Sequence, residues 1–140
     1  MSVSNEYAAG LFDGEGCFGL YQTSPNTWTP TVQLKLRSRD ASVLYEMCER
    51  WGGQIRVIDY TKRAPMTCWS LRTFNGVLAF IQDVYPYLVL KHTQASVLQK
   101  YCTTGTQRRG MGVKVPTDVS TFRMLCAEAL SFLNRKGADV

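Results

Sequence analysis

The sequence has few of the residues from which metal sites and disulfide frameworks are built. Its only histidine is His92, and its five cysteines stand far apart, with no CxxC pair among them. A structural zinc site needs four Cys or His ligands at short spacings, and an odd number of cysteines leaves one thiol over in any set of disulfides. We therefore expect reduced thiols and an intracellular location, in the cytoplasm or in an organelle such as a chloroplast or mitochondrion.

Long apolar runs are missing as well. No stretch approaches the roughly 20 residues that cross a bilayer as a helix. The first ten residues, MSVSNEYAAG, lack the basic flank and the apolar centre of a signal peptide. We therefore expect neither a membrane partner nor secretion. The 140 residues, 45% of them apolar, fit one domain over 1–140 with a core of its own.

Acidic residues are outnumbered by basic ones. The chain carries 16 Lys and Arg against 11 Asp and Glu, which gives a net charge of +5. An excess of positive charge favours a polyanionic partner. It does not by itself distinguish nucleic acid from an anionic lipid surface.

Hydrophobic spacing predicts an alternation of helices and strands. We expect a helix over 4–13 that ends at Gly14 and Gly16, strands over 17–23 and 31–37 with a loop over 24–30, a helix from an N-cap at Asp40 to Trp51, strands over 54–60 and 67–73, and helices over 74–84, 87–102 and 117–136. Two hairpins in this order form an antiparallel sheet, and helices cover one of its faces. The sequence therefore predicts an α+β fold.

Alternation within the expected strands separates an apolar face from a polar one. Residues 31–37 (TVQLKLR) show it most clearly, with apolar side chains at the even positions. The polar face would carry Tyr21, Thr23, Gln33, Lys35, Arg37, Gln54, Arg56, Tyr60, Ser70 and Arg72. Basic, amide and hydroxyl groups without an acid suit phosphates and base edges. An ordinary solvated face is the alternative, although such faces usually mix Glu with Lys.

The stretch YAAGLFDGEG, residues 7–16, carries two features that point to chemistry. Ala8, Ala9 and Gly10 are small enough for two helices to approach closely. The expected helix then ends in Asp-Gly-Glu-Gly, which puts two carboxylates beside the unpaired carbonyls of a helix C-terminus. That arrangement becomes favourable around a divalent cation, because Mg²⁺ takes carboxylate, carbonyl and water oxygens as ligands. On spacing alone, a plain Asp-Gly-Glu-Gly turn remains the alternative.

The segment AAGLFDGEG, residues 8–16, resembles the LAGLIDADG motif of homing endonucleases. Gly10 matches its helix-packing glycine and Asp13 to Gly16 its acidic end, whereas Ala8 replaces a leucine and Gly14 an alanine. A second segment, PYLVLKHTQA over 86–95, resembles the family's Pro-aromatic-Leu-x-Leu-Lys-x-x-Gln-Ala pattern. The likeness extends over roughly 4–105. It implies the αββαββα fold of the single-motif members, with a saddle-shaped antiparallel sheet.

The resemblance implies a role for individual residues. It makes Glu15 a catalytic acid and a metal ligand, with Gly14 beside it as a second ligand through its carbonyl. It makes Lys91 the lysine that polarises water or stabilises the charged phosphate. The polar residue that organises solvent in the active site would be Arg37 or Arg39, where the second expected strand ends.

One motif supplies one metal-binding acid, so the resemblance implies that two copies of the chain pair through their motif helices. The expected interface residues are Ala9, Gly10 and Asp13. The implied activity is that of a site-specific endonuclease that cuts both strands of a long, partly palindromic duplex and leaves 3′ overhangs. Mg²⁺ is the implied cofactor, with Mn²⁺ as a substitute.

Two further expectations concern the partner. Arg108 and Arg109, in the loop over 103–116, are expected to contact phosphates, with a solvated loop as the alternative. The rival interpretation of the whole chain is a non-cleaving protein of the same fold, either an intron RNA maturase or a DNA-binding regulator. The presence of both Glu15 and Lys91 favours the nuclease, because a protein that only binds has no need of the pair.

Overall fold

The computed structural model describes residues 3–25, 27–104 and 117–135. The elements are α1 (Asn5–Glu15), β1 (Gly16–Ser24), β2 (Thr27–Arg37), a short 3-10 helix (Ser38–Asp40), α2 (Ser42–Trp51), β3 (Gln54–Ile58), β4 (Met66–Leu71), α3 (Phe74–Val84), a second 3-10 helix (Tyr85–Tyr87), α4 (His92–Thr104) and α5 (Thr117–Leu133). This order of helices and strand pairs is the predicted one.

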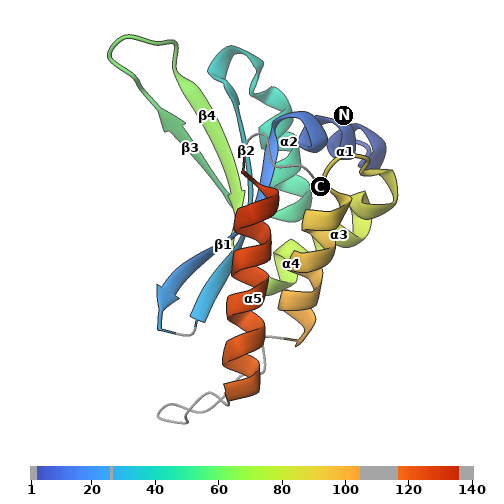
Figure 1. Cartoon of the computed structure of the whole chain (residues 1–140). Coiled ribbons are helices and arrows are strands. Elements are labelled where there is room, and N and C mark those ends of the chain that lie inside the picture. The colour runs from blue at the N-terminus through green and yellow to red at the C-terminus, as the bar shows by residue number, and fades with distance from the viewer. Residues whose placement is uncertain (1–2, 26, 105–116, 136–140) are drawn as a thin grey trace.

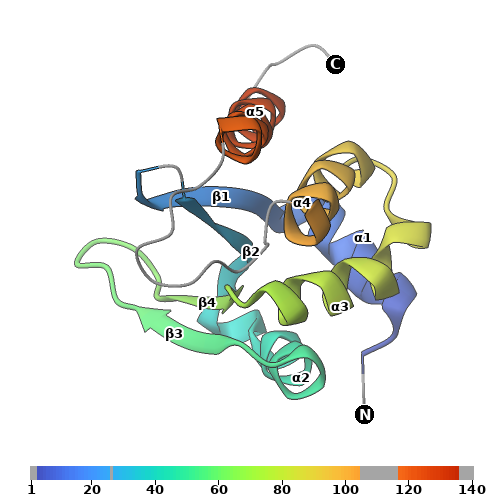
Figure 2. The same ribbon diagram turned by 90° about the horizontal axis from the view of Figure 1, so that it is seen from below.

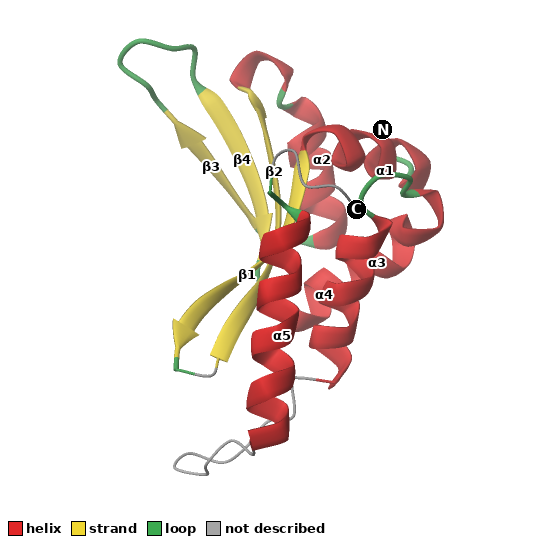
Figure 3. Ribbon diagram, viewed as in Figure 1, coloured by secondary structure: helices red, strands yellow, loops and turns green. Residues whose placement is uncertain are grey.

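The four strands form one antiparallel sheet in the order β1-β2-β4-β3. β2 pairs with β1 over its first part and with β4 over its last part, so the two hairpins extend in opposite directions from the middle of the sheet (Figure 1). Helices α1 to α4 lie on one side of the sheet, and α5 runs along β1 (Figures 2 and 3). The predicted α+β class and antiparallel sheet are confirmed.

Aromatic side chains join α1 to the sheet. The Phe12 ring of α1 lies 4.4 Å from the ring of Phe18 in β1 and 5.3 Å from that of Phe80 in α3. Trp69 of β4 completes the cluster, with its ring 5.4 Å from Phe80. All four side chains are fully buried. This packing fixes the direction of α1 and therefore the place where its C-terminal end meets β1.

The structure corrects two boundaries that were predicted from glycine and proline, namely the end of α1 and the start of β2. α1 continues through Gly14 to Glu15, and the Gly16 N–H donates to the Phe12 carbonyl. Most of the predicted loop over 24–30 is strand, because β2 begins at Thr27 and includes Pro30. Proline lacks the N–H that a central strand needs. Pro30 is tolerated because the pairing of β2 with β4 ends at Val32, so among the described strands β1 alone is its neighbour.

Two helix starts also differ from the prediction. Asp40 is not an N-cap; it lies in the 3-10 helix, and α2 begins two residues later without a side-chain cap. Residues 88–91 are not helical, and α4 begins at His92. Lys91 therefore precedes α4 instead of lying on it. The N–H groups of residues 89–91 are turned toward a side chain of α1, as described below.

Helix α5 covers the outer edge of the sheet. The Asn134 side chain, just beyond the helix, donates to the Phe18 carbonyl of β1 at 2.7 Å. An edge strand with unpaired backbone groups is prone to pair with other chains, and a helix along the edge prevents this. Across residues 3–25, 27–104 and 117–135, no helix has the length and apolar character needed to cross a bilayer.

Candidate active site and nucleic-acid interface

Asp13 ties the end of α1 to the segment that precedes α4. Its Oδ2 accepts the Val89 N–H at 2.7 Å, and its Oδ1 accepts the N–H groups of Leu90 and Lys91 at 3.1 and 3.0 Å. Hydrogen bonds to a carboxylate are stronger than those between neutral groups. With Asp13 only 7% exposed, this contact holds two segments together that are 76–78 residues apart in the sequence.

The Lys91 side chain returns to the same turn of α1. Its Nζ donates to the Asp13 carbonyl at 2.8 Å, which places an ammonium at the negative end of the helix dipole. Its charge also reaches Cys17, the second residue of β1. Burial raises the pKa of the Cys17 thiol, and the Lys91 charge acts in the opposite direction and lowers it. Lys91 therefore lies at the junction of α1 with β1.

Glu15 is the last residue of α1 and stands at this junction with an exposed side chain. Gly14 before it is exposed as well, and no atom lies within 4 Å of the place a Cβ would take. Gly16, the residue that follows Glu15, pairs with Leu34, the residue that precedes Lys35 on the neighbouring strand. Of the predicted catalytic residues, the structure brings Glu15 and Lys91 together at one end of α1.

The two arginines predicted to organise solvent lie farther along the chain. Arg37 is the last residue of β2 and pairs with Met66; it stands two residues, or about 7 Å, beyond Lys35. Arg39 is in the 3-10 helix, with its side chain 75% exposed and its Nε 3.6 Å from Asp40. Lys35, which the sequence assigned only to DNA, is therefore nearer along the chain to the partner of Gly16 than either arginine is.

The exposed side of α1 differs from the interface predicted for it. Ala9 is fully buried and Asp13 nearly so within the single chain, so these two predictions are corrected: their side chains face inward. Gly10 is exposed, as an interface residue must be, and Gly14 follows it at the spacing of one helical turn. No atom lies within 4 Å of a Cβ added at either glycine, and Tyr7 on the same side is 58% exposed.

The predicted polar face is assembled in rows across the sheet. Gln33, Ser70 and Gln54 form one row, and Lys35, Cys68 and Arg56 form the next. No strand residue in these rows is acidic. Tyr21 stands on the β1–β2 hairpin opposite Thr29, and Thr23 lies where the register of that hairpin shifts. Arg72 follows β4, and Tyr60 lies in the segment between β3 and β4.

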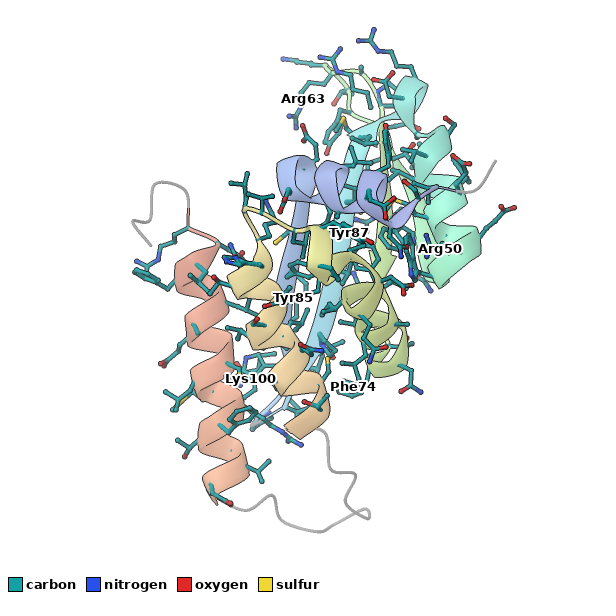
Figure 4. All side chains as sticks on the ribbon, turned by 90° about the vertical axis from the view of Figure 1, so that its right-hand side faces the viewer. Arg50, Arg63, Phe74, Tyr85, Tyr87 and Lys100 are labelled. Carbon is teal, nitrogen blue, oxygen red and sulfur yellow. The ribbon has the colours of Figure 1, made fainter. Side chains whose placement is uncertain are left out.

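A basic hollow beside these rows adds a residue that the sequence analysis missed. Its volume is about 650 Å³, and it is lined by Lys35, Arg37, Tyr60, Arg63, Ala64 and Met66. The Arg63 guanidinium lies 4.2 Å from the centre of the Tyr60 ring, which holds it over the hollow. Figure 4 shows Arg63 on the segment between β3 and β4, at the end of the molecule above α1. The basic pair Lys62-Arg63, between the strands expected over 54–60 and 67–73, was the available signal.

Two predicted contacts, Arg108 and Arg109, lie outside the described residues. Among the described residues, no three His, Cys, Asp or Glu side chains come together as a set of metal ligands. The residues just after α5 contribute another cation that sequence reasoning did not identify. Arg135 joins Cys17 and Tyr21 in lining a hollow of about 280 Å³ along β1.

The sequence model of the LAGLIDADG endonuclease family matches residues 8–103. The match takes in most of α1, the whole sheet, Lys91 and most of α4. This chain belongs to the LAGLIDADG homing endonuclease family. No curated protein matches it in sequence.

Solved structures of homing endonucleases share the fold. I-CvuI, in complex with the I-CreI DNA target and Mg without cleavage of the DNA, has a TM-score of 0.72 at 16% identity, over 97% of this chain and 85% of its own. The archaeal intron-encoded I-Vdi141I, in complex with DNA, has a TM-score of 0.71 at 16% identity, over 95% and 85%. I-GzeII, also with its DNA target, has a TM-score of 0.63 at 18% identity, over 99% and 53%.

Proposed function

We propose that the chain is a site-specific homing endonuclease that acts as a homodimer on a long, partly palindromic DNA duplex. It would hydrolyse one phosphodiester bond in each strand and leave 3′ overhangs. The observation that carries the proposal is the junction of α1 with β1, where the Asp13 carboxylate and carbonyl hold Lys91 at the helix end that presents Glu15. The family membership and the basic rows of the sheet support it.

The oxygen atoms at the junction suit a hard divalent cation. Glu15 offers an exposed carboxylate, and Gly14 offers a carbonyl in the last turn of a helix, where no later N–H of the helix bonds it. We infer Mg²⁺, with Mn²⁺ as a substitute, held by these two residues together with phosphate and water oxygens. A cation bound there supplies an activated water and neutralises charge on the phosphate. Asp13 is not a ligand in this proposal, because three N–H groups occupy its carboxylate.

The remaining residues of the junction orient the DNA and stabilise charge. Lys91, with its stem half-buried and its ammonium held in place, would stabilise the negative charge that develops on the phosphate. Lys35 follows the residue of β2 that pairs with Gly16, and would bind a neighbouring phosphate. Arg56 and the hollow with Arg63 would extend this contact along the duplex.

Each chain carries one Glu15, and a duplex has two strands to cut. We propose that two copies meet through the exposed side of α1, where Gly10 and Gly14 permit close approach of two helices. The two copies of Glu15 would then lie on either side of the axis between the helices. Each would serve one strand. Pairing also doubles the net charge of +5 that a single chain brings to DNA.

The test is cleavage of a randomised library of duplex DNA in millimolar Mg²⁺, with sequencing of the new ends. Wild-type protein should cut one partly palindromic sequence and leave 3′ overhangs. Glu15→Gln should retain the bound duplex and lose cleavage by orders of magnitude, whereas Glu49→Gln, an exposed acid on α2, should cut as wild type does. Wild-type protein that selects a duplex and leaves it intact would favour the non-cleaving rival.

A further inference from the structure

A buried tyrosine hydroxyl holds the outer part of the β1–β2 hairpin. Tyr101 lies on α4 and is 1% exposed. Its hydroxyl accepts the backbone N–H of Trp28 at 3.2 Å and donates to the backbone carbonyl of the same residue. A single phenol thus satisfies both backbone groups of one residue on β2, 73 positions away in the sequence.

The sheet leaves these two backbone groups without a strand to pair with. β4 accompanies β2 only as far as Val32, so residues 27–31 have β1 on one side and no strand on the other. Unpaired backbone groups beside a protein core are costly. Pro30 reduces the problem because it has no N–H, and the Tyr101 hydroxyl takes the place of the missing strand at Trp28.

The hydroxyl is chemically suited to this double role. Burial raises the pKa of the Tyr101 hydroxyl, while the hydrogen bond from the Trp28 backbone N–H and the charge of Arg123 act in the opposite direction. The phenol therefore keeps the proton with which it donates to the carbonyl. Packing alone does not require the hydroxyl, because a phenylalanine ring would fill the same place 6.3 Å from the ring of Phe74.

The hairpin that Tyr101 holds is the part of the sheet farthest along β1 from the candidate active site. From Gly16, next to Glu15, to Ser24 the strand rises about 26 Å, which is roughly the length of 7–8 base pairs. Tyr21 and Thr23, both exposed, lie on this outer part. The direction of the hairpin therefore decides which bases these side chains reach.

We propose that Tyr101 is a positioning residue that sets the direction of the β1–β2 hairpin and thereby the base preference at the outer positions of the DNA site. It takes no part in the chemistry of cleavage. The inference rests on the proposed function, since it assumes that DNA lies along the polar face of the sheet.

The experiment compares wild type, Tyr101→Phe and Tyr85→Phe on the duplex recovered from the random library and on its single-base variants. Tyr101→Phe retains the ring and its packing, and should fold. It should reduce discrimination about tenfold at positions five or more base pairs from the cut, and leave inner positions and the cleavage rate at saturating protein unchanged. Tyr85, on the surface next to α3 (Figure 4), has a hydroxyl that bonds Ser96, and its variant should behave as wild type.

Hydrogen exchange distinguishes a failure of the inference about Tyr101 from a failure of the proposed function. The Trp28 amide should exchange at least tenfold faster in Tyr101→Phe than in wild type, with or without DNA. Unchanged exchange overturns the inference, and so does faster exchange with an unchanged preference or with an equal loss at every position. Wild-type protein that selects no duplex overturns the proposed function, and the inference with it.

Discussion

Replacement of Asp13 by asparagine tests the contact on which the candidate active site depends. The new side-chain amide would retain one oxygen for the N–H groups of Leu90 and Lys91. Its nitrogen would face the Val89 N–H. In the wild-type chain, the Val89 nitrogen lies 2.7 Å from the Asp13 Oδ2 atom. The substitution therefore removes the negative charge and sets two donors against each other, with almost no change in size.

The expected loss of stability follows from these three hydrogen bonds. The Val89 contact is only partly buried, so an N–H left there without a partner costs about 1 kcal/mol, and weakening two charge-assisted bonds to neutral ones costs about 0.5–1 kcal/mol each. We expect Asp13→Asn to lower the free energy of unfolding by roughly 2–3 kcal/mol. Asp40→Asn is the matched control. Its carboxylate is 63% exposed and lies 3.6 Å from Arg39, so the change should cost less than about 1 kcal/mol.

Urea unfolding at fixed protein concentration measures both variants, and hydrogen exchange at Val89 shows where the loss arises. DNA cleavage by Asp13→Asn should fall in parallel, because Lys91 loses its fixed position. An Asp13→Asn variant as stable as wild type, with the Val89 amide still protected, would show that the Asp13 carboxylate does not hold residues 89–91 in place.

Three further predictions use other parts of the chain. Lys91→Met should slow single-turnover cleavage at saturating protein at least tenfold, or about 1.4 kcal/mol of barrier, and slow alkylation of Cys17, whose pKa rises further without the nearby charge. Burial raises the pKa of the Cys102 thiol from 9.0 to about 12, so the folded chain keeps a proton that the unfolded chain releases. Urea titrations should show this thiol lowering the free energy of unfolding by about 1.4 kcal/mol per pH unit between pH 9 and 12, and Cys102→Ala should remove that part of the slope. Gly53→Ala should cost about 2–4 kcal/mol by thermal unfolding, because φ is +100° and the new Cβ would overlap the Ser70 carbonyl oxygen.

The order of the elements could be predicted because short-range patterns carry it. The apolar alternation of residues 31–37 marked the buried side of β2, on which Val32 and Leu34 are fully buried. Gly52 and Gly53 ended α2 and have φ values of +82° and +100°, which other residues rarely adopt. These signals act within a few residues and need no knowledge of the rest of the chain.

The parts that the sequence did not predict depend on contacts between distant segments. Pro30 indicated a loop until the sheet order showed that β4 does not reach it. The apolar spacing after Pro86 predicted a helix. Residues 89–91 are not helical, because their N–H groups donate to the Asp13 carboxylate. The same contact explains why Asp13 faces inward instead of forming the predicted interface. The position of Lys35, next to the residue that pairs with Gly16, became known only through the register of β1 with β2.

Two paired chains, each with one Glu15 for one strand of DNA, should act unequally when one of the two acids is removed. A mixed dimer of one wild-type chain and one Glu15→Gln chain, isolated through two different tags, provides the test. On the duplex recovered from the library, the mixed dimer should nick one strand at nearly the wild-type rate and leave the other intact. Cleavage of both strands at the wild-type rate by the mixed dimer would show that each strand does not need its own Glu15.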